Sequence, residues 1–118
     1  MELFHATNRE AADKISCSRV MDPGSHGYAG GAIYLSKRED GACRKYNNGR
    51  GNAEILILCK VQLGRVLEVD KNTVSEKEVR LWGYDSVKIK GLDDVYEPSQ
   101  VNVCHFRLVN NDEWFNTM

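Results

Sequence analysis

Two tyrosines and a pair of glycines lie close together in residues 28–46, YAGGAIYLSKREDGACRKY. Gly30 and Gly31 carry no Cβ, so their backbone can approach a ligand closely. Tyr34 follows in a short apolar run, and Tyr46 lies roughly three helical turns further on. Two aromatic rings beside a glycine turn suit a flat aromatic ligand, whereas tyrosines near strand ends can equally be half-buried core residues. Residues 28–46 are therefore the candidate binding segment.

Histidine and cysteine side chains are the other groups that could act on a ligand or a metal. His5 ends an apolar N-terminal segment, where a histidine can contact a ligand or serve as a satisfied structural residue. A zinc site built from the three histidines and the cysteines lacks a close ligand pair, so we predict no metal site. The cysteines are widely spaced, with no CxxC, and we expect reduced thiols with two of them inside strands. The residues considered are His5, His26, His105, Cys17, Cys43, Cys59 and Cys104.

Short strands in the first half of the chain must position these residues. Residues 2–6 predict a strand that ends near His5, and residues 32–35 predict a second strand that carries Tyr34. The glycine-rich residues 21–31 predict a loop, and such a loop can either bind a ligand or simply cover the surface.

Two helices are expected to follow these strands. Ser36 and Glu39 have the S-x-x-E spacing of a capping box, which predicts a helix over about 37–46. Thr7 and Glu10 have the same spacing, which predicts an earlier helix directly after the first strand.

The second half of the chain is typical of strands. Residues 55–58 are apolar without alternation, which predicts a central strand covered on both faces. Residues 101–109 predict a last strand with partial cover on both faces, followed by a tail that docks Trp114 or Phe115. The other expected elements are strands over 65–69, 86–90 and 95–96, a helix over 72–82, and a turn over 91–94. These elements together predict an α+β fold with a mostly antiparallel sheet.

Length and composition set bounds on the function. The 118 residues suit one domain spanning 1–118, and the net charge of −1 gives no strong nucleic-acid signature. No apolar run approaches the ~20 residues that span a bilayer, so we expect no membrane partner. The N-terminus has no signal-peptide pattern, which favours an intracellular protein, cytoplasmic or nuclear.

Four segments in order resemble the catalytic domain of the poly(ADP-ribose) polymerase (PARP) family, the diphtheria-toxin-like ADP-ribosyltransferases. LFHAT resembles the family's strand ending in His-Gly-Thr/Ser, and GGAIYLS with the downstream ACRKY resembles its Gly-x-Gly-Ile-Tyr-Phe-Ala strand and Tyr-ending helix. GYDSV resembles its Gly-Tyr/Phe-Asp-Ser-Val turn and strand, and VYEPSQV is similar to its Val-Tyr-Asp-x-x-Gln-Val/Ala segment. The segments are Leu3–Thr7, Gly30–Tyr46, Gly83–Val87 and Val95–Val101. The resemblance implies a split, mostly antiparallel β-structure with an NAD cleft between two sheets.

The resemblance also implies roles for individual residues. His5 would hydrogen-bond the adenosine ribose of NAD, Tyr34 would lie under the nicotinamide ribose, and Tyr46 would stack on the nicotinamide ring. The backbone of Ala6 would hold the carboxamide, where the family has glycine. The implied NAD-binding residues are His5, Ala6, Thr7, Gly31, Tyr34, Ser36, Cys43 and Tyr46.

Two positions depart from the family pattern. The family's carboxamide-clamping serine falls at Ala42 or Cys43, depending on a one-residue gap before Tyr46. The catalytic glutamate of the polymer-forming members falls at Leu92, and a leucine cannot stabilise an oxocarbenium-like transition state. Asp93 would take that place only after a one-residue shift, and otherwise belongs to a solvated turn. The catalytic residues implied are therefore His5 and Tyr34, together with position Leu92 or Asp93.

These implications lead to three functional hypotheses. The first is an enzyme that uses NAD as co-substrate and transfers one ADP-ribose unit to an unknown protein or nucleic-acid acceptor. The second is an inactive NAD- or ADP-ribose-binding or interaction module, which the leucine and the missing serine favour. The third is an NAD hydrolase with water as acceptor.

Overall fold

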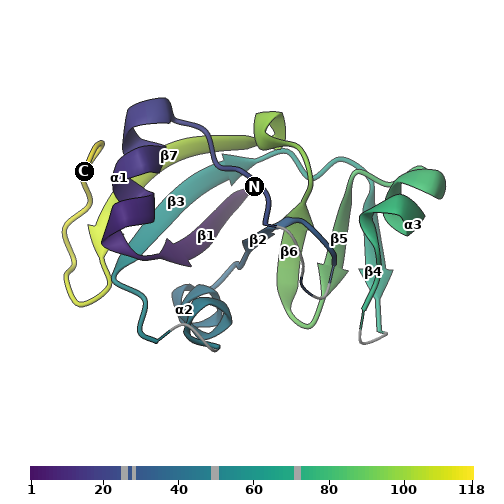
Figure 1. Cartoon of the computed structure of the whole chain (residues 1–118), viewed down its shortest axis with the longest axis horizontal. Helices are drawn as coiled ribbons and strands as arrows, with labels where there is room; N and C mark the ends of the chain where they lie inside the picture. The colour runs from purple at the N-terminus through teal and green to yellow at the C-terminus, as the bar shows by residue number, and fades with distance from the viewer. Residues whose placement is uncertain (25–26, 28, 49–50, 71–72) are drawn as a thin grey trace.

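The structure is a computed structural model that describes residues 1–24, 27, 29–48, 51–70 and 73–118. Expectations that fall on His26, Tyr28, residues 49–50 and residues 71–72 lie outside the described residues. Within them, seven strands form two sheets, and three α-helices pack around these sheets. This confirms the α+β class with mostly antiparallel sheets (Figure 1). In chain order the elements are β1 (Glu2–Thr7), α1 (Arg9–Ser18), β2 (Ile33–Leu35), α2 (Glu39–Asn47), β3 (Ile55–Val61), β4 (Val66–Val69), α3 (Glu76–Leu81), β5 (Ser86–Ile89), β6 (Leu92–Val95), a 3-10 turn (Pro98–Gln100) and β7 (Val101–Leu108).

The first sheet has the strand order β1-β3-β7 and is antiparallel throughout. Its central strand β3 is the one whose unbroken apolar run predicts cover on both faces, and five of its seven residues are buried. Cys59 in β3 and Cys104 in β7 are both free, as are Cys17 and Cys43. The expectations of a central strand and of two cysteines inside strands are confirmed.

Strand β7 changes its inward face partway along its length. The register shifts between Leu58 and Cys59 of β3, so that Cys104 has no partner in the ladder. Such a bulge moves every following side chain to the other face of the sheet. Val103 before the bulge and Phe106 after it are therefore both buried, although simple alternation places them on opposite faces.

The second sheet has the strand order β2-β6-β5-β4, in which only the β4–β5 pair is parallel. Strands β5 and β6 form a tight hairpin whose two turn residues, Lys90 and Gly91, have φ of 54° and 77°. Two positive φ values characterise the I′ turn that matches the twist of paired strands. The predicted turn over 91–94 was therefore wrong, because the chain reverses at 90–91 and residues 92–95 are already strand.

The capping residues predicted for the first two helices were also wrong. Asn8, rather than Thr7, caps α1 by accepting the Ala11 amide at 2.7 Å. Ser36 does not cap α2, because its Oγ accepts from the Arg38 amide at 3.1 Å before the helix begins at Glu39. A short polar side chain can satisfy a turn as well as a helix end, so the spacing alone did not decide between them.

Three helices are arranged around the two sheets. Helix α2 lies across β1 at the boundary between the sheets, and α3 lies beside β4 at the far end (Figure 1). Helix α3 is shorter than predicted, and it begins with a capping box formed by Ser75 and Glu78. Both terminal nitrogens of Arg107 in β7 contact the Glu39 carboxylate, which ties the start of α2 to the first sheet.

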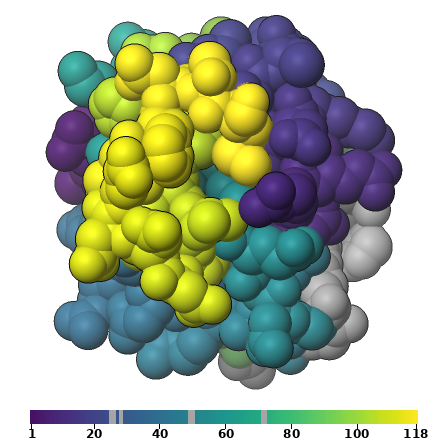
Figure 2. Space-filling view, turned by 90° about the vertical axis from the view of Figure 1, so that its left-hand side faces the viewer, coloured from purple at the N-terminus to yellow at the C-terminus, as the bar shows by residue number. Residues whose placement is uncertain are grey.

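The C-terminal segment covers one end of the molecule (Figure 2). Phe115 forms a two-way backbone bridge to Phe106, and the Trp114 ring stacks on Phe4 with centroids 6.2 Å apart. The expected docking of the tail is confirmed.

Candidate ligand site at the junction of the two sheets

The two sheets are joined where β1 meets the end of β2. Phe4 and Ser36 exchange two backbone hydrogen bonds, with N···O distances of 2.7 and 2.9 Å. Beside this bridge, His5 Nδ1 lies 2.8 Å from the Tyr34 carbonyl oxygen. A carbonyl oxygen only accepts, so Nδ1 carries the proton and the orientation of the ring is fixed. The structure therefore brings His5 and Tyr34 together from opposite sides of the junction.

The Tyr34 side chain is held by the loop that precedes its strand. Its hydroxyl accepts from the Ala29 amide at 3.0 Å and donates to the Gly30 carbonyl at 2.8 Å. A Cβ added at Gly27 would lie 2.1 Å from this hydroxyl, so the close approach requires glycine there. The Lys45 ammonium lies 4.4 Å from the centre of the Tyr34 ring, a cation–π distance.

Tyr46 occupies a neighbouring position on α2. Its ring is half-buried and packs against a cluster formed by Ala6, Ala42 and Leu56, which Cys43 also joins. Ala6 directly follows His5 in β1, so successive residues of one strand adjoin the Tyr34 and the Tyr46 sides of the junction. Thr7 is buried at the end of the same strand. Gly31 is half-buried in the segment before β2.

Cys43 occupies one of the two positions where the resemblance expects a serine. Burial raises the pKa of the Cys43 thiol, and the Glu39 carboxylate raises it further. The thiol is therefore protonated at neutral pH, and it is not poised as a thiolate nucleophile.

Leu92 and Asp93 begin β6 but face opposite sides of the second sheet, because side chains alternate along a strand. Asp93 pairs with Leu35 and with Lys88 in an unbroken register. Leu92 is 6% exposed and lies one step nearer Ser36. The ladder is regular at this point. The position that the resemblance matches to the family's glutamate is Leu92.

Asp94 is a buried acid that the sequence placed in a turn. It pairs with Tyr34 across β2 and β6 and is 0% exposed. Neither carboxylate oxygen has a hydrogen-bond partner among the described residues. Burial raises the pKa of Asp94 to about 8, as does the Asp93 charge, while the Lys45 ammonium acts in the opposite direction. Asp94 is therefore mostly protonated at neutral pH and can donate a hydrogen bond.

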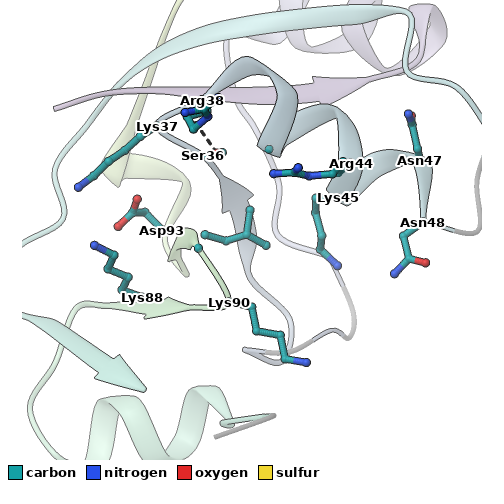
Figure 3. Close-up of a pocket in the computed structure, with 13 residues that line it drawn as sticks. Ser36, Lys37, Arg38, Arg44, Lys45, Asn47, Asn48, Lys88, Lys90 and Asp93 are labelled. Atoms are coloured by element: carbon teal, nitrogen blue, oxygen red, sulfur yellow. Dashed lines mark hydrogen bonds between the residues drawn. The ribbon is translucent and has the colours of Figure 1, made fainter. Parts of the chain in front are cut away.

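A pocket of about 770 Å³ lies beside the junction, between α2 and the β5–β6 hairpin (Figure 3). Ser36 and Leu92 line it, as do Asn47 and Asn48 at the end of the helix. Asp93 contributes the only carboxylate among the described lining residues. Its cationic lining residues, which we call the basic pocket residues, are Lys37, Arg38, Arg44, Lys45, Lys88 and Lys90.

No protein-family model matches the chain, and no curated protein matches it either. Within the described ranges, no three histidine, cysteine or acidic side chains cluster closely enough to hold a metal ion. The described helices also include none that is both long and apolar enough to cross a bilayer.

Proposed function

We propose that the chain is an NAD-dependent mono-ADP-ribosyltransferase. The observation that carries this proposal is the meeting of His5 and Tyr34 at the bridge between two sheets, with Tyr46 packed beside Ala6. These residues come from β1, β2 and α2, which are separated along the chain. They are also the residues that the resemblance assigns to the two riboses and the nicotinamide ring of NAD.

The fixed groups at the junction suit an extended dinucleotide. The Nδ1 bond to Tyr34 orients the His5 ring, whose Nε2 in the neutral form accepts a hydrogen bond from a ribose hydroxyl. The Tyr46 ring provides a flat face for the nicotinamide, and such stacking contributes ~0.5–1.5 kcal/mol beyond burial of area. The backbone of Ala6 at the end of β1 offers an amide and a carbonyl to the carboxamide.

The proposed reaction breaks the bond between the nicotinamide nitrogen and C1′ of the ribose. Nicotinamide leaves with the bonding electron pair, and a nucleophilic atom of the acceptor forms a bond to C1′ and releases its proton. The protein contributes mainly by holding the two partners in line, which replaces a bimolecular encounter by an oriented one. With leucine at the glutamate position, stabilisation of the developing positive charge is weak. Transfer of a single unit is therefore favoured over polymer synthesis.

The second candidate is an NAD- or ADP-ribose-binding module without catalytic activity. The observation that favours it is the aliphatic side chain of Leu92, which adjoins the bridge residue Ser36 where a transferase would place an acid. Slow hydrolysis of NAD is a third outcome, in which water is the only acceptor.

Labelled NAD separates these candidates. The protein is incubated with NAD labelled in its adenylate part, and products are resolved as labelled macromolecule, free ADP-ribose and nicotinamide. A transferase labels a macromolecule and releases nicotinamide, a hydrolase releases both small products, and a binding module does neither while calorimetry still detects NAD. If calorimetry detects no NAD binding at millimolar concentration, the transferase, the hydrolase and the NAD-binding module are all excluded, and only a module that binds ADP-ribose remains.

A matched pair of histidine variants tests where NAD binds. His5→Ala removes the ring at the junction, whereas His105→Ala removes a half-buried histidine in the middle of β7. We expect weaker NAD binding only for His5→Ala. Equal affinities for the two folded variants would contradict the assignment of His5.

A further inference from the structure

The basic pocket concentrates positive charge that the composition of the chain conceals. The chain has 16 Lys and Arg against 17 Asp and Glu, yet the described pocket lining has six cationic side chains and one carboxylate. The cations come from two separate elements, the α2 region and the β5–β6 hairpin, and surround one concavity (Figure 3). A concave surface of one sign concentrates its field and attracts counter-ions of the opposite sign.

Two of these cations, Arg38 and Arg44, share one carboxylate. Asp40 contacts Arg38, with an N···O distance of 3.0 Å, and more distantly Arg44 at 3.9 Å. Among the described residues, neither Lys37 nor Lys88 has an ion-pair partner. A positive surplus therefore remains at the pocket.

The position of Asp93 indicates the shape of the anion that fits. Asp93 is 3% exposed and lies between Lys37 and Lys88 (Figure 3). Its Oδ2 atom is buried without a hydrogen-bond partner in the described part of the chain. A carboxylate at this depth repels a compact phosphate that enters the pocket, while the surrounding cations attract negative charge along the rim. A linear polymer with separated negative charges can contact the cations along the rim and avoid Asp93 better than a single phosphate can.

We propose that the basic pocket binds the sugar–phosphate backbone of a single-stranded nucleic acid. Lysine and arginine contacts to phosphate supply affinity without reading sequence, and the amides of Asn47 and Asn48 provide further donors. Contacts to phosphate carry no direct information on sequence, so we expect binding to be independent of base identity. A flexible single strand can enter a pocket of about 770 Å³, whereas a stiff duplex cannot bend into it.

The location of the pocket gives this strand a role in the reaction. Ser36 and Leu92 line the pocket, and Ser36 also forms the bridge beside His5 and Tyr34. A strand in the pocket therefore lies next to the place where the nicotinamide ribose is proposed to bind. We assign the nucleic acid as the acceptor of ADP-ribose. This assignment rests on the proposed function, whereas binding of the strand does not.

The binding test uses fluorescence anisotropy with a short labelled single-stranded oligonucleotide and no NAD. Lys37→Gln combined with Lys88→Gln removes two pocket charges. Lys60→Gln combined with Lys77→Gln removes two exposed charges on β3 and α3 that do not line the pocket. At about 50 mM salt, we expect the pocket variant to lose at least about tenfold in affinity and the control variant to be nearly unchanged.

Salt dependence makes the test sharper. Each phosphate contact on a single strand contributes about 0.7 to the steepness of the slope of log affinity against log salt. The pocket variant removes two such contacts, so its slope should be shallower than that of wild type by about 1.4. Equal loss in the two double variants, or stronger binding of a duplex or of polyglutamate, would overturn the proposal. Circular dichroism confirms that each variant is folded.

The acceptor role is tested separately with labelled NAD and the unlabelled oligonucleotide. Label that moves to the oligonucleotide in wild type, and less so in the pocket variant, supports the role. If calorimetry shows NAD binding and the strand also binds, but no label is transferred, the acceptor role is overturned. If NAD does not bind while the strand does, the proposed function fails and the nucleic-acid site stands.

Discussion

The two sheets bury different kinds of side chain. Around β3 the first sheet buries aliphatic and aromatic groups almost exclusively, with Leu3, Ile57 and Phe106 all at 0% exposure. The second sheet also buries polar residues, including Asp93 and Asp94. A buried polar group without a hydrogen bond costs free energy relative to an apolar group of similar shape.

This difference indicates where the chain gives up stability. The first sheet follows the pattern that maximises burial of apolar surface, and it supports the His5 end of the junction. The second sheet retains acids that an aliphatic side chain could replace, and they lie next to Tyr34 and the basic pocket. Unsatisfied groups of this kind are frequent where a site must hold a ligand. We therefore infer that the first sheet is the stable scaffold of the fold, and that the second sheet supplies the side chains that determine which ligand binds.

The largest expected loss of stability is on the scaffold. Phe106→Ala removes a fully buried ring from the first sheet and leaves a cavity, so we expect the free energy of unfolding to fall by about 3–5 kcal/mol. Leu108→Ala, in the same strand but 37% exposed, should cost far less. Urea denaturation measures both. Comparable losses would show that the first sheet is not the tightly packed part of the molecule.

Asp94→Asn tests the cost of the buried acid. The unfolded carboxyl ionises near pH 4, whereas the pKa of Asp94 in the fold is about 8. Between these values only the folded form keeps the proton, so the stability that wild type derives from Asp94 is full below about pH 4 and is lost as pH rises toward 8. An asparagine does not titrate.

We therefore expect the free energy of unfolding of Asp94→Asn to rise relative to that of wild type, by about 1.4 kcal/mol for each unit that the pH increases across this window. Unfolding measured by urea at several pH values gives the difference directly. A constant difference across the window would mean that Asp94 is ionised in the fold, and the contrast between the sheets would lose its main support.

Tyr34→Phe tests how firmly the second sheet holds its covering loop. The variant loses the hydroxyl that contacts Ala29 and Gly30, and the buried Ala29 amide then lacks its acceptor. We expect a loss of about 1–2 kcal/mol in the free energy of unfolding. The control is Tyr84→Phe, because the Tyr84 hydroxyl has no hydrogen-bond partner within the described ranges, and it should change stability much less. Equal effects would mean that the loop does not depend on Tyr34.

The sequence predicted the first sheet better than the second, for a physical reason. The unbroken apolar run of β3 has one stable environment, the centre of a sheet, so its placement followed directly. The turn between β5 and β6 was predicted too late and too long because Lys90 adopts a positive φ, which lysine rarely does, and because LDDV contains two acids. Residues 92–95 have no local preference for a strand, and they form one because tertiary packing overrides that preference.

The site was predictable only in part. Resemblance selected His5 and Tyr34, and the structure places the two in contact through the Tyr34 carbonyl. The basic pocket was invisible in the composition, because its cations lie on α2 and on a hairpin far along the chain and are balanced by acids elsewhere. Asp94 was visible as a residue but not as a buried one, because its burial follows from pairing with Tyr34.

The smallest effect concerns Tyr46, on which the nicotinamide assignment depends. Its ring packs against a cluster that belongs to the first sheet and α2, so this side of the proposed site is built on the scaffold. Tyr46→Ala removes the ring, and we expect NAD affinity to fall by at least ~1 kcal/mol, about fivefold. Calorimetry with NAD measures the change.

Tyr46→Phe is the matched control, because it keeps the ring and removes only the hydroxyl. If stacking is the contribution of Tyr46, Tyr46→Phe should bind NAD nearly as well as wild type. A loss in Tyr46→Phe equal to that in Tyr46→Ala would assign the effect to the hydroxyl instead. Unchanged affinity in a folded Tyr46→Ala would place the nicotinamide elsewhere, and would leave the second sheet to supply all of the contacts that distinguish NAD.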